Sequence, residues 1–164
     1  MSNPNKLIVI VLGSHRSGTS VITKLVSYLG FNLGVKLMEP NRDNPKGYFE
    51  DVDIYNLNEK ILKAINKNWY DIDFIDRSVL VDLTNEKIFN EAISLIKEKI
   101  KDNQTIIIKD PRISILLPFW TKVFEKLELS TKYVCSIRNP LDVSLSLNIR
   151  DRNTSGVQKD HGQK

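Results

Sequence analysis

Residues 7–20, LIVIVLGSHRSGTS, decide the fold, because they join a buried strand to a helix through a turn bounded by glycines. Leu7 to Leu12 is a continuous apolar run rich in β-branched residues, the pattern of a parallel strand that is buried on both faces. From Ser20 to Leu29 the apolar residues recur with helical spacing, and Gly30 is a favourable residue just past the end of a helix. The stretch therefore predicts a strand, a tight loop and a helix in direct succession.

The turn from Gly13 to Ser20 has the composition of a phosphate-binding loop. Its glycines let the backbone approach a ligand closely, and consecutive N–H groups at a helix N-terminus attract an anion. Hydrogen bonds to a charged group contribute roughly 1.5–3 kcal/mol each, against about 0.3–2 kcal/mol for the helix terminus, so the donors dominate. The side chains expected to complete this site are Arg16, Thr19 and Ser20.

The same turn departs from the G-x-x-x-x-G-K-[ST] pattern of nucleoside triphosphate enzymes at one position. Both glycines and the final hydroxyl match, but Thr19 stands where the pattern has lysine. That lysine holds the β- and γ-phosphates of a triphosphate. We therefore expect a ligand with a single 5′ phosphate-like anion, with Arg16 as the cation that replaces the lysine.

Further strands and helices are predicted along the rest of the chain. Buried strands are expected at Thr105 to Ile108 and Tyr133 to Ile137, with Ser78 to Leu83 as a weaker fourth. The predicted helices run over Asp53 to Ile65, from a cap at Thr84 through the stripe Ile88 to Ile100, and over about Leu141 to Ile149. This alternation predicts an α/β fold with a central parallel sheet flanked by helices, whose ligands bind outside the carboxyl ends of the strands. Residues 1–150 form one predicted domain, and 151–164 a polar, flexible tail.

The composition excludes several other classes of protein. The 164 residues are 41% apolar and 27% charged, which is typical of one globular domain with a single core. Only one cysteine, Cys135, and two separated histidines, His15 and His161, are present, which argues against a disulfide framework or a zinc cluster. The formal charge of +4 is spread along the chain, so neither a nucleic acid nor a membrane is an expected partner. Without a signal-peptide pattern, a cytoplasmic location is expected.

A second candidate anion site follows the last predicted strand, in the stretch RNPLDVSLS from Arg138 to Ser146. Arg138 stands at the carboxyl end of a strand, and Ser146 lies about two turns into the next helix. Together with the first loop, this stretch resembles the sulfotransferases that use 3′-phosphoadenosine 5′-phosphosulfate (PAPS). In that family a P-[KR]-S-G-T-[ST] loop binds the 5′-phosphosulfate, and a later R-N-P-x-D-V-x-x-S stretch binds the 3′-phosphate.

The resemblance covers residues 7–150 and includes a middle segment, Ile106 to Pro111 followed by Leu116 to Trp120; His15 stands where many relatives have proline. It implies a three-layer fold like that of the P-loop NTPases, PAPS as co-substrate and no required metal. The residues that it implies for the 5′ side are Arg16, Ser17, Gly18, Thr19 and Ser20. Those that it implies for the 3′ phosphate are Arg138 and Ser146.

Sulfuryl transfer also needs cations near the sulfur and a base for the acceptor. Arg16 and Lys109 are the expected cations. Many relatives use a histidine as base at the position of Pro111. In another branch of the family, which acts mainly on saccharides, the base is a glutamate in the segment that follows the first helix. In the polar segment Met38 to Asp51, Glu50 is the expected base, ahead of Glu39 and Asp110, although an acid just before a helix also suits capping. Trp69, Tyr70 and Arg112 are expected around the acceptor, a saccharide or small molecule.

Two other functions compete with sulfuryl transfer. Val79 to Asp82 and Ile106 to Asp110 each resemble the apolar strand and aspartate that hold Mg²⁺ in P-loop kinases. The other alternative is a truncated or inactive PAPS-binding module, because relatives usually continue into a basic, glycine-containing loop that closes over the nucleotide. Residues 150–164 offer basic side chains and Gly156 without a recognisable version of that loop. The sequence predicts no particular oligomeric state.

Overall fold

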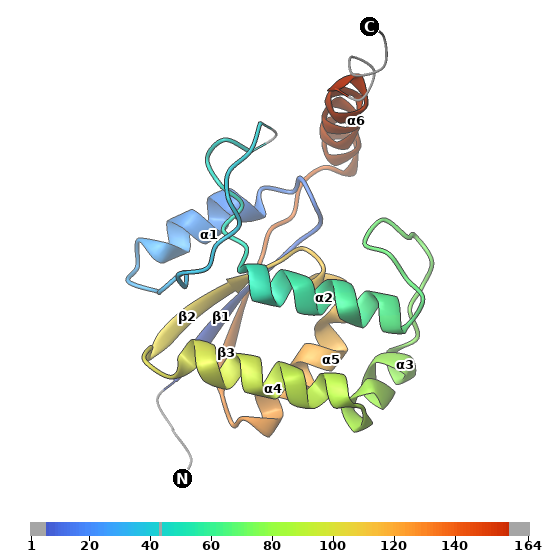
Figure 1. Ribbon diagram of the computed structural model, residues 1–164. Coiled ribbons are helices and arrows are strands. Elements are labelled where there is room, and N and C mark those ends of the chain that lie inside the picture. Colours follow the sequence, from blue (N-terminus) through green and yellow to red (C-terminus); the bar gives the residue numbers. More distant parts are fainter. Residues whose placement is uncertain (1–5, 43, 158–164) are drawn as a thin grey trace, which may run out of the picture.

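The computed structural model describes residues 6–42 and 44–157, and it confirms an α/β architecture. In this part of the chain the sheet has three parallel strands in the order β2-β1-β3 (Figure 1). Their bounds are β1 Leu7–Leu12, β2 Thr105–Lys109 and β3 Ser130–Cys135. The strand predicted first in the sequence is thus the central one, and its neighbours run parallel to it on both sides.

Helices cover both faces of the sheet and extend beyond its carboxyl edge. They are α1 Thr19–Ser27, α2 Val52–Ala64, α3 Arg77–Asp82, α4 Lys87–Ile100, α5 Ile113–Lys126 and α6 Pro140–Val157, with a 3₁₀ turn at Leu83–Asn85. The Asp51 side chain begins α2 by accepting hydrogen bonds from the backbone N–H groups of Asp53 and Ile54. None of the helices in the described ranges is long and apolar enough to cross a membrane.

The larger core lies between one face of the sheet and helices α2, α4 and α5. Ile8 and Ile10 of β1 point into it, and α5 contributes Phe119 and Trp120, both fully buried. The indole Nε1 of Trp120 donates to Asn58 Oδ1 over 2.8 Å, so its one polar atom is satisfied. Complete burial of such side chains contributes about 1.5–3 kcal/mol each, which makes this face the main source of stability.

The opposite face of the sheet has a much smaller core. Val9, Val11 and Ile107 form it, because successive side chains of a strand alternate between the two faces. It is covered by α1, through Ile22 and Val26, and by the chain that follows α1. The sheet is therefore flanked by helices unequally.

The prediction of a fourth strand at Ser78 to Leu83 was wrong. The segment forms α3 and the start of the 3₁₀ turn, and Asp76 caps α3 by accepting from the backbone N–H of Ser78. A short apolar run does not by itself distinguish a strand from a helix, and within α3 only Leu80 is buried. Thr84 lies inside the 3₁₀ turn instead of capping α4, which begins after Glu86.

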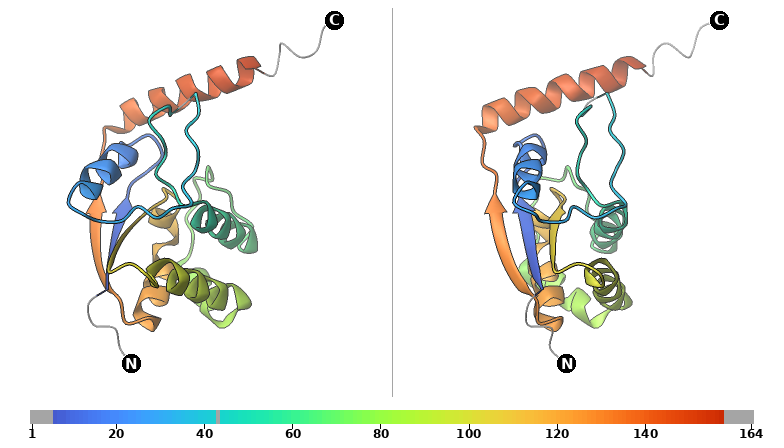
Figure 2. Two further views of the ribbon diagram at one scale, coloured as in Figure 1. Left: turned by 60° about the vertical axis from the view of Figure 1, so that its left-hand side comes forward. Right: turned by 90° about the vertical axis from the view of Figure 1, so that its left-hand side faces the viewer.

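Strand β3 and helix α6 also differ from their predicted bounds. β3 starts three residues earlier than predicted, at Ser130, because an edge strand tolerates polar residues on its exposed side. Helix α6 begins at Pro140, with the Asn139 side chain accepting from the Leu141 N–H, and continues to Val157. It therefore includes the first seven residues of the predicted flexible tail; residues 158–164 lie outside the described ranges. Figure 2 shows α6 beyond the carboxyl ends of the strands.

Candidate functional site

The loop after β1 has a backbone that only glycine allows at its first position. A Cβ on Gly13 would lie 2.7 Å from Ser17 Oγ and 2.8 Å from the carbonyl oxygen of Ser136. Gly18 has φ of +97° and precedes α1 without a side-chain cap, and the first turn of α1 carries no acid. The helix N-terminus therefore keeps its positive end for a ligand, as the sequence predicts.

Two serines from other elements fasten this loop in place. The backbone N–H of Gly13 donates to Ser114 Oγ of α5 over 2.9 Å, and Ser136 Oγ donates to the carbonyl of Ser17 over 2.8 Å. Ser17 Oγ itself donates to the carbonyl of Ser14. Ser17 thus stabilises the loop from within and is not among the residues that line the neighbouring cavity, unlike the other predicted loop residues.

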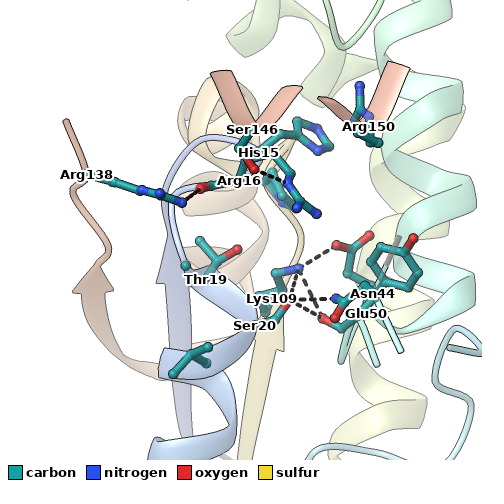
Figure 3. Close-up of a pocket in the computed structure, with 14 residues that line it drawn as sticks. His15, Arg16, Thr19, Ser20, Asn44, Glu50, Lys109, Arg138, Ser146 and Arg150 are labelled. Atoms are coloured by element: carbon teal, nitrogen blue, oxygen red, sulfur yellow. Dashed lines mark hydrogen bonds and ion pairs between the residues drawn. The ribbon is translucent and has the colours of Figure 1, made fainter. Parts of the chain in front are cut away.

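A cavity of about 270 Å³ opens beside the loop at the carboxyl edge of the sheet (Figure 3). Four of its lining side chains are basic, Arg16, Lys109, Arg138 and Arg150, and a single one, Glu50, is acidic. This imbalance favours an anion with more than one charge. The remaining lining residues are His15, Gly18, Thr19, Ser20, Val21, Asn44, Tyr48, Pro111 and Ser146.

The two predicted anion sites meet in this cavity. Arg138 Nη1 donates to the carbonyl oxygen of Arg16 over 3.2 Å, and Arg16 Nε donates to Ser146 Oγ over 2.9 Å. Figure 3 shows the Arg138 guanidinium directed toward the loop from the side of β3. The pair that the sequence places after the third strand therefore contacts the glycine loop directly.

Lys109 and Glu50 form a buried ion pair at the end of β2. Lys109 Nζ lies 2.5 Å from Glu50 Oε1 and also donates to the carbonyl of Tyr48 over 3.1 Å and toward Ser20 Oγ at 3.4 Å. The side chains are 3% and 7% exposed, which places the pair out of bulk water. Burial raises the pKa of the Glu50 carboxyl above its ordinary value, and the charges of Lys109 and Arg112 oppose that shift.

The other two candidate bases have different surroundings. Glu39 is exposed and does not line the cavity. Asp110 is fully buried, and one of its oxygens accepts from the backbone N–H and from Nη1 of Arg112. Its second oxygen, Oδ2, has no hydrogen-bond partner within the described ranges. Of the three acids, only Glu50 faces the basic cavity.

The residues predicted around the acceptor fall into two groups. Trp69 and Arg112 line a second cavity that adjoins the first, whereas Tyr70 is 63% exposed and packs edge-on against Trp69. Arg112 is buried and bonded to Asp110 and Glu59, with its guanidinium over the ring of Tyr55. Its role within the fold is to neutralise these acids.

His15 and Arg150 are site residues to which the sequence analysis gave no role. His15 lines both cavities, and its ring lies 4.5 Å from that of Trp69. Burial, followed by the charge of Arg112, lowers the pKa of His15 to about 4, so the imidazole is neutral. Arg150 comes from the last part of α6, and its guanidinium lies 5.1 Å from the Trp69 ring. No local motif marks either residue, because both depend on where α6 and residue 69 lie in the fold.

The comparisons with known proteins do not assign the chain to a family. It matches no family model, and neither a curated protein nor a solved structure matches it significantly. Within the described ranges there is also no group of three or more histidine, cysteine or acidic side chains that would hold a metal ion.

Proposed function

We propose that this protein transfers a sulfuryl group from PAPS to the hydroxyl or amine of an acceptor, a saccharide or small molecule. One observation carries the proposal: Arg138, Arg16 and Ser146 are joined by hydrogen bonds around a single basic cavity. A nucleotide with phosphate groups on both the 5′ and the 3′ side needs donors of this kind close together. Thr19 at the position of the usual lysine fits a single 5′ anion better than a triphosphate.

Five of the lining residues have a role in holding the donor. The loop N–H groups around Gly18, with the hydroxyls of Thr19 and Ser20, hold the 5′-phosphosulfate at the N-terminus of α1. Arg138 and Ser146 hold the 3′-phosphate. Arginine suits this position because its planar fork forms two hydrogen bonds to a phosphate.

The reaction itself needs charge stabilisation and one proton transfer. The acceptor oxygen forms a bond to sulfur while the bond from sulfur to the bridging phosphate oxygen breaks, and that oxygen leaves with the electron pair as adenosine 3′,5′-bisphosphate. Lys109 and Arg16 stabilise the charge on the transferred group and on the leaving oxygen. The acceptor proton passes to the carboxylate of Glu50, whose raised pKa makes it the stronger base once it is ionised.

A P-loop kinase is the competing function, and the structure offers less in its favour. Val79 to Asp82 lies within helix α3 and not at the end of a strand, so it does not provide a metal-binding carboxylate of the expected kind. Asp110 follows β2 but is bonded to Arg112 and does not line the cavity. A nucleotide-binding module without activity retains the same cavity, and activity assays separate it from an enzyme.

The donor site is tested by calorimetry. We expect adenosine 3′,5′-bisphosphate to bind without Mg²⁺, and Arg138→Ala and Ser146→Ala to weaken binding by at least tenfold and about threefold, respectively. Lys122→Ala on α5, an exposed lysine paired with Glu125, is the matched control and leaves affinity unchanged. Tight binding of ATP that requires Mg²⁺ contradicts the proposal and supports the kinase.

Transfer is tested with radiolabelled PAPS against mixed saccharides and phenols. We expect Glu50→Gln to lower turnover at least tenfold while bisphosphate affinity is retained, because the amide keeps the shape of the side chain but accepts no proton. Unchanged turnover removes Glu50 from the role of base. Inactivity of the unaltered protein toward every acceptor, despite bisphosphate binding, supports the module.

A further inference from the structure

A second cavity, of about 430 Å³, adjoins the basic one at the glycine loop. His15 and Pro111 line both, so the two spaces share a wall. The second cavity extends from there toward the end of β3 and the start of α5, where Ile137 and Ile115 line it. The sequence predicts Trp69 and Arg112, which line this space, around the acceptor, but it does not distinguish a saccharide from another small molecule.

The second cavity differs from the first in chemistry. Leu12, Trp69, Ile115 and Ile137 give it apolar walls. Its one charged lining residue, Arg112, is buried and already paired with Asp110 and Glu59. Ile137 is 91% exposed, so its side chain is accessible to a ligand in this cavity. The cavity therefore suits an uncharged, apolar group.

His15 lies where the two cavities meet and has an unused polar atom. Its Nε2 is buried and has no hydrogen-bond partner among the described residues. Such atoms are uncommon in folded proteins, because an unsatisfied buried polar group costs free energy. The neutral imidazole forms a hydrogen bond with a hydroxyl group when a rotation of its ring brings Nε2 to the wall of either cavity.

We propose that the second cavity binds the body of the acceptor, an aromatic or short alkyl alcohol, and that His15 hydrogen-bonds its hydroxyl beside the donor. The inference rests on the proposed sulfuryl transfer and narrows its acceptor. A saccharide carries hydroxyls around its whole ring, and those facing Leu12, Ile115 and Ile137 would lose their hydrogen bonds to water. The cavity therefore selects for an apolar body with one hydroxyl.

Fluorine NMR with 4-fluorophenol tests the cavity in the presence of adenosine 3′,5′-bisphosphate. We expect Ile137→Asp to weaken 4-fluorophenol binding at least tenfold, because a carboxylate in an apolar wall disfavours the ring. Ile72→Asp is the matched control: Ile72 is 99% exposed, lines neither cavity, and its replacement leaves affinity unchanged. Methyl glucoside is expected not to displace the phenol. Equal binding to Ile137→Asp, or displacement by the glucoside, overturns the assignment.

A comparison with a ligand that lacks the hydroxyl tests the role of His15. We expect His15→Phe, which keeps an aromatic ring, to weaken 4-fluorophenol binding about three- to tenfold and to leave 4-fluorotoluene unaffected. An equal loss for both ligands means that His15 only packs against them and contradicts the hydrogen bond. Phenol binding as expected, in a protein that does not bind the bisphosphate, supports the cavity assignment and contradicts the proposed function.

Discussion

The two faces of the sheet differ in the size of the hydrophobic core that they carry. We call the face with the larger core the thick face and the face with the smaller core the thin face. One face is covered by α2, α4 and α5 around fully buried Phe119 and Trp120. The other is covered mainly by α1, which leaves Val21 and Leu25 of that helix, and Leu29 just after it, more than half exposed. Most predicted site residues belong to the loop before α1, to α1 itself and to the chain after β3, on or near the thin face. Most residues that would bind a ligand therefore lie apart from the larger core, which provides most of the stability.

The largest expected effect comes from the thick face. Trp120→Ala is expected to lower the free energy of unfolding by about 3–5 kcal/mol, because it leaves a cavity in the core and removes the donor to Asn58. Urea denaturation measures the change. Trp69→Ala is the control for losing a partly buried indole at the edge of this core and is expected to cost less than half as much. A loss below about 1 kcal/mol for Trp120→Ala would contradict the claim that the larger core provides most of the stability.

Two neighbouring residues of β2 provide a matched comparison of the faces. Ile108 points into the larger core and Ile107 into the smaller one, and both are at least 95% buried. Replacement of a buried isoleucine by alanine costs about 2–5 kcal/mol, with the larger values where the surroundings are unable to collapse. We expect Ile108→Ala to cost more than Ile107→Ala in the same denaturation experiment. The reverse order would mean that α1 packs as firmly as the three helices opposite.

His15 should make the free energy of unfolding depend on pH. The unfolded chain takes up a proton as the pH falls through 6.5, whereas folded His15 remains neutral down to about 4. Between these values the unfolded state binds more protons, so stability falls with the pH, by up to about 3 kcal/mol in all. Comparing unaltered protein with His15→Asn from pH 7 to 4 isolates this effect. Parallel curves for the two proteins would contradict the lowered pKa.

The smallest effect is expected on the exposed side of α1. Leu25 is 55% exposed, so Leu25→Lys should change the free energy of unfolding by no more than about 0.5 kcal/mol. The same urea titration measures it, and Ile22→Lys, which faces the smaller core, is the destabilising comparison. A large loss at Leu25 would indicate that the exposed surface of α1 has a packing partner.

The sequence predicts the elements whose environment is simple and misses those whose environment depends on the rest of the fold. The pattern predicts β1 and β2 closely, because both strands are buried on both faces of the sheet and are therefore continuous apolar runs. The pattern of α3 predicts a strand, since its few apolar residues fit either period, and the pattern of β3 predicts a later start because the outer side of this strand is exposed. Local pattern carries no information on which residues a neighbouring element will cover.

The candidate site likewise contains residues that the sequence predicts and residues that it does not. The convergence of Arg16, Lys109 and Arg138 follows from topology, because parallel strands end at one edge of the sheet. The ion pair of Glu50 with Lys109 and the burial of His15 depend on how residues 44–51 and residue 69 lie over that edge. No spacing along the chain encodes such an approach, so the sequence does not distinguish Glu50 from the two other candidate bases and assigns no role to His15.

The serines that fasten the glycine loop have a consequence for how fast a ligand is bound. Ser114 and Ser136 hold the loop from α5 and from the end of β3, so its shape is set when the chain folds. A preorganised loop loses little conformational entropy when an anion arrives, and most of the interaction energy then appears as affinity. Association should consequently proceed without a slow isomerisation step, and amide exchange in this loop should be nearly as slow before binding as after it.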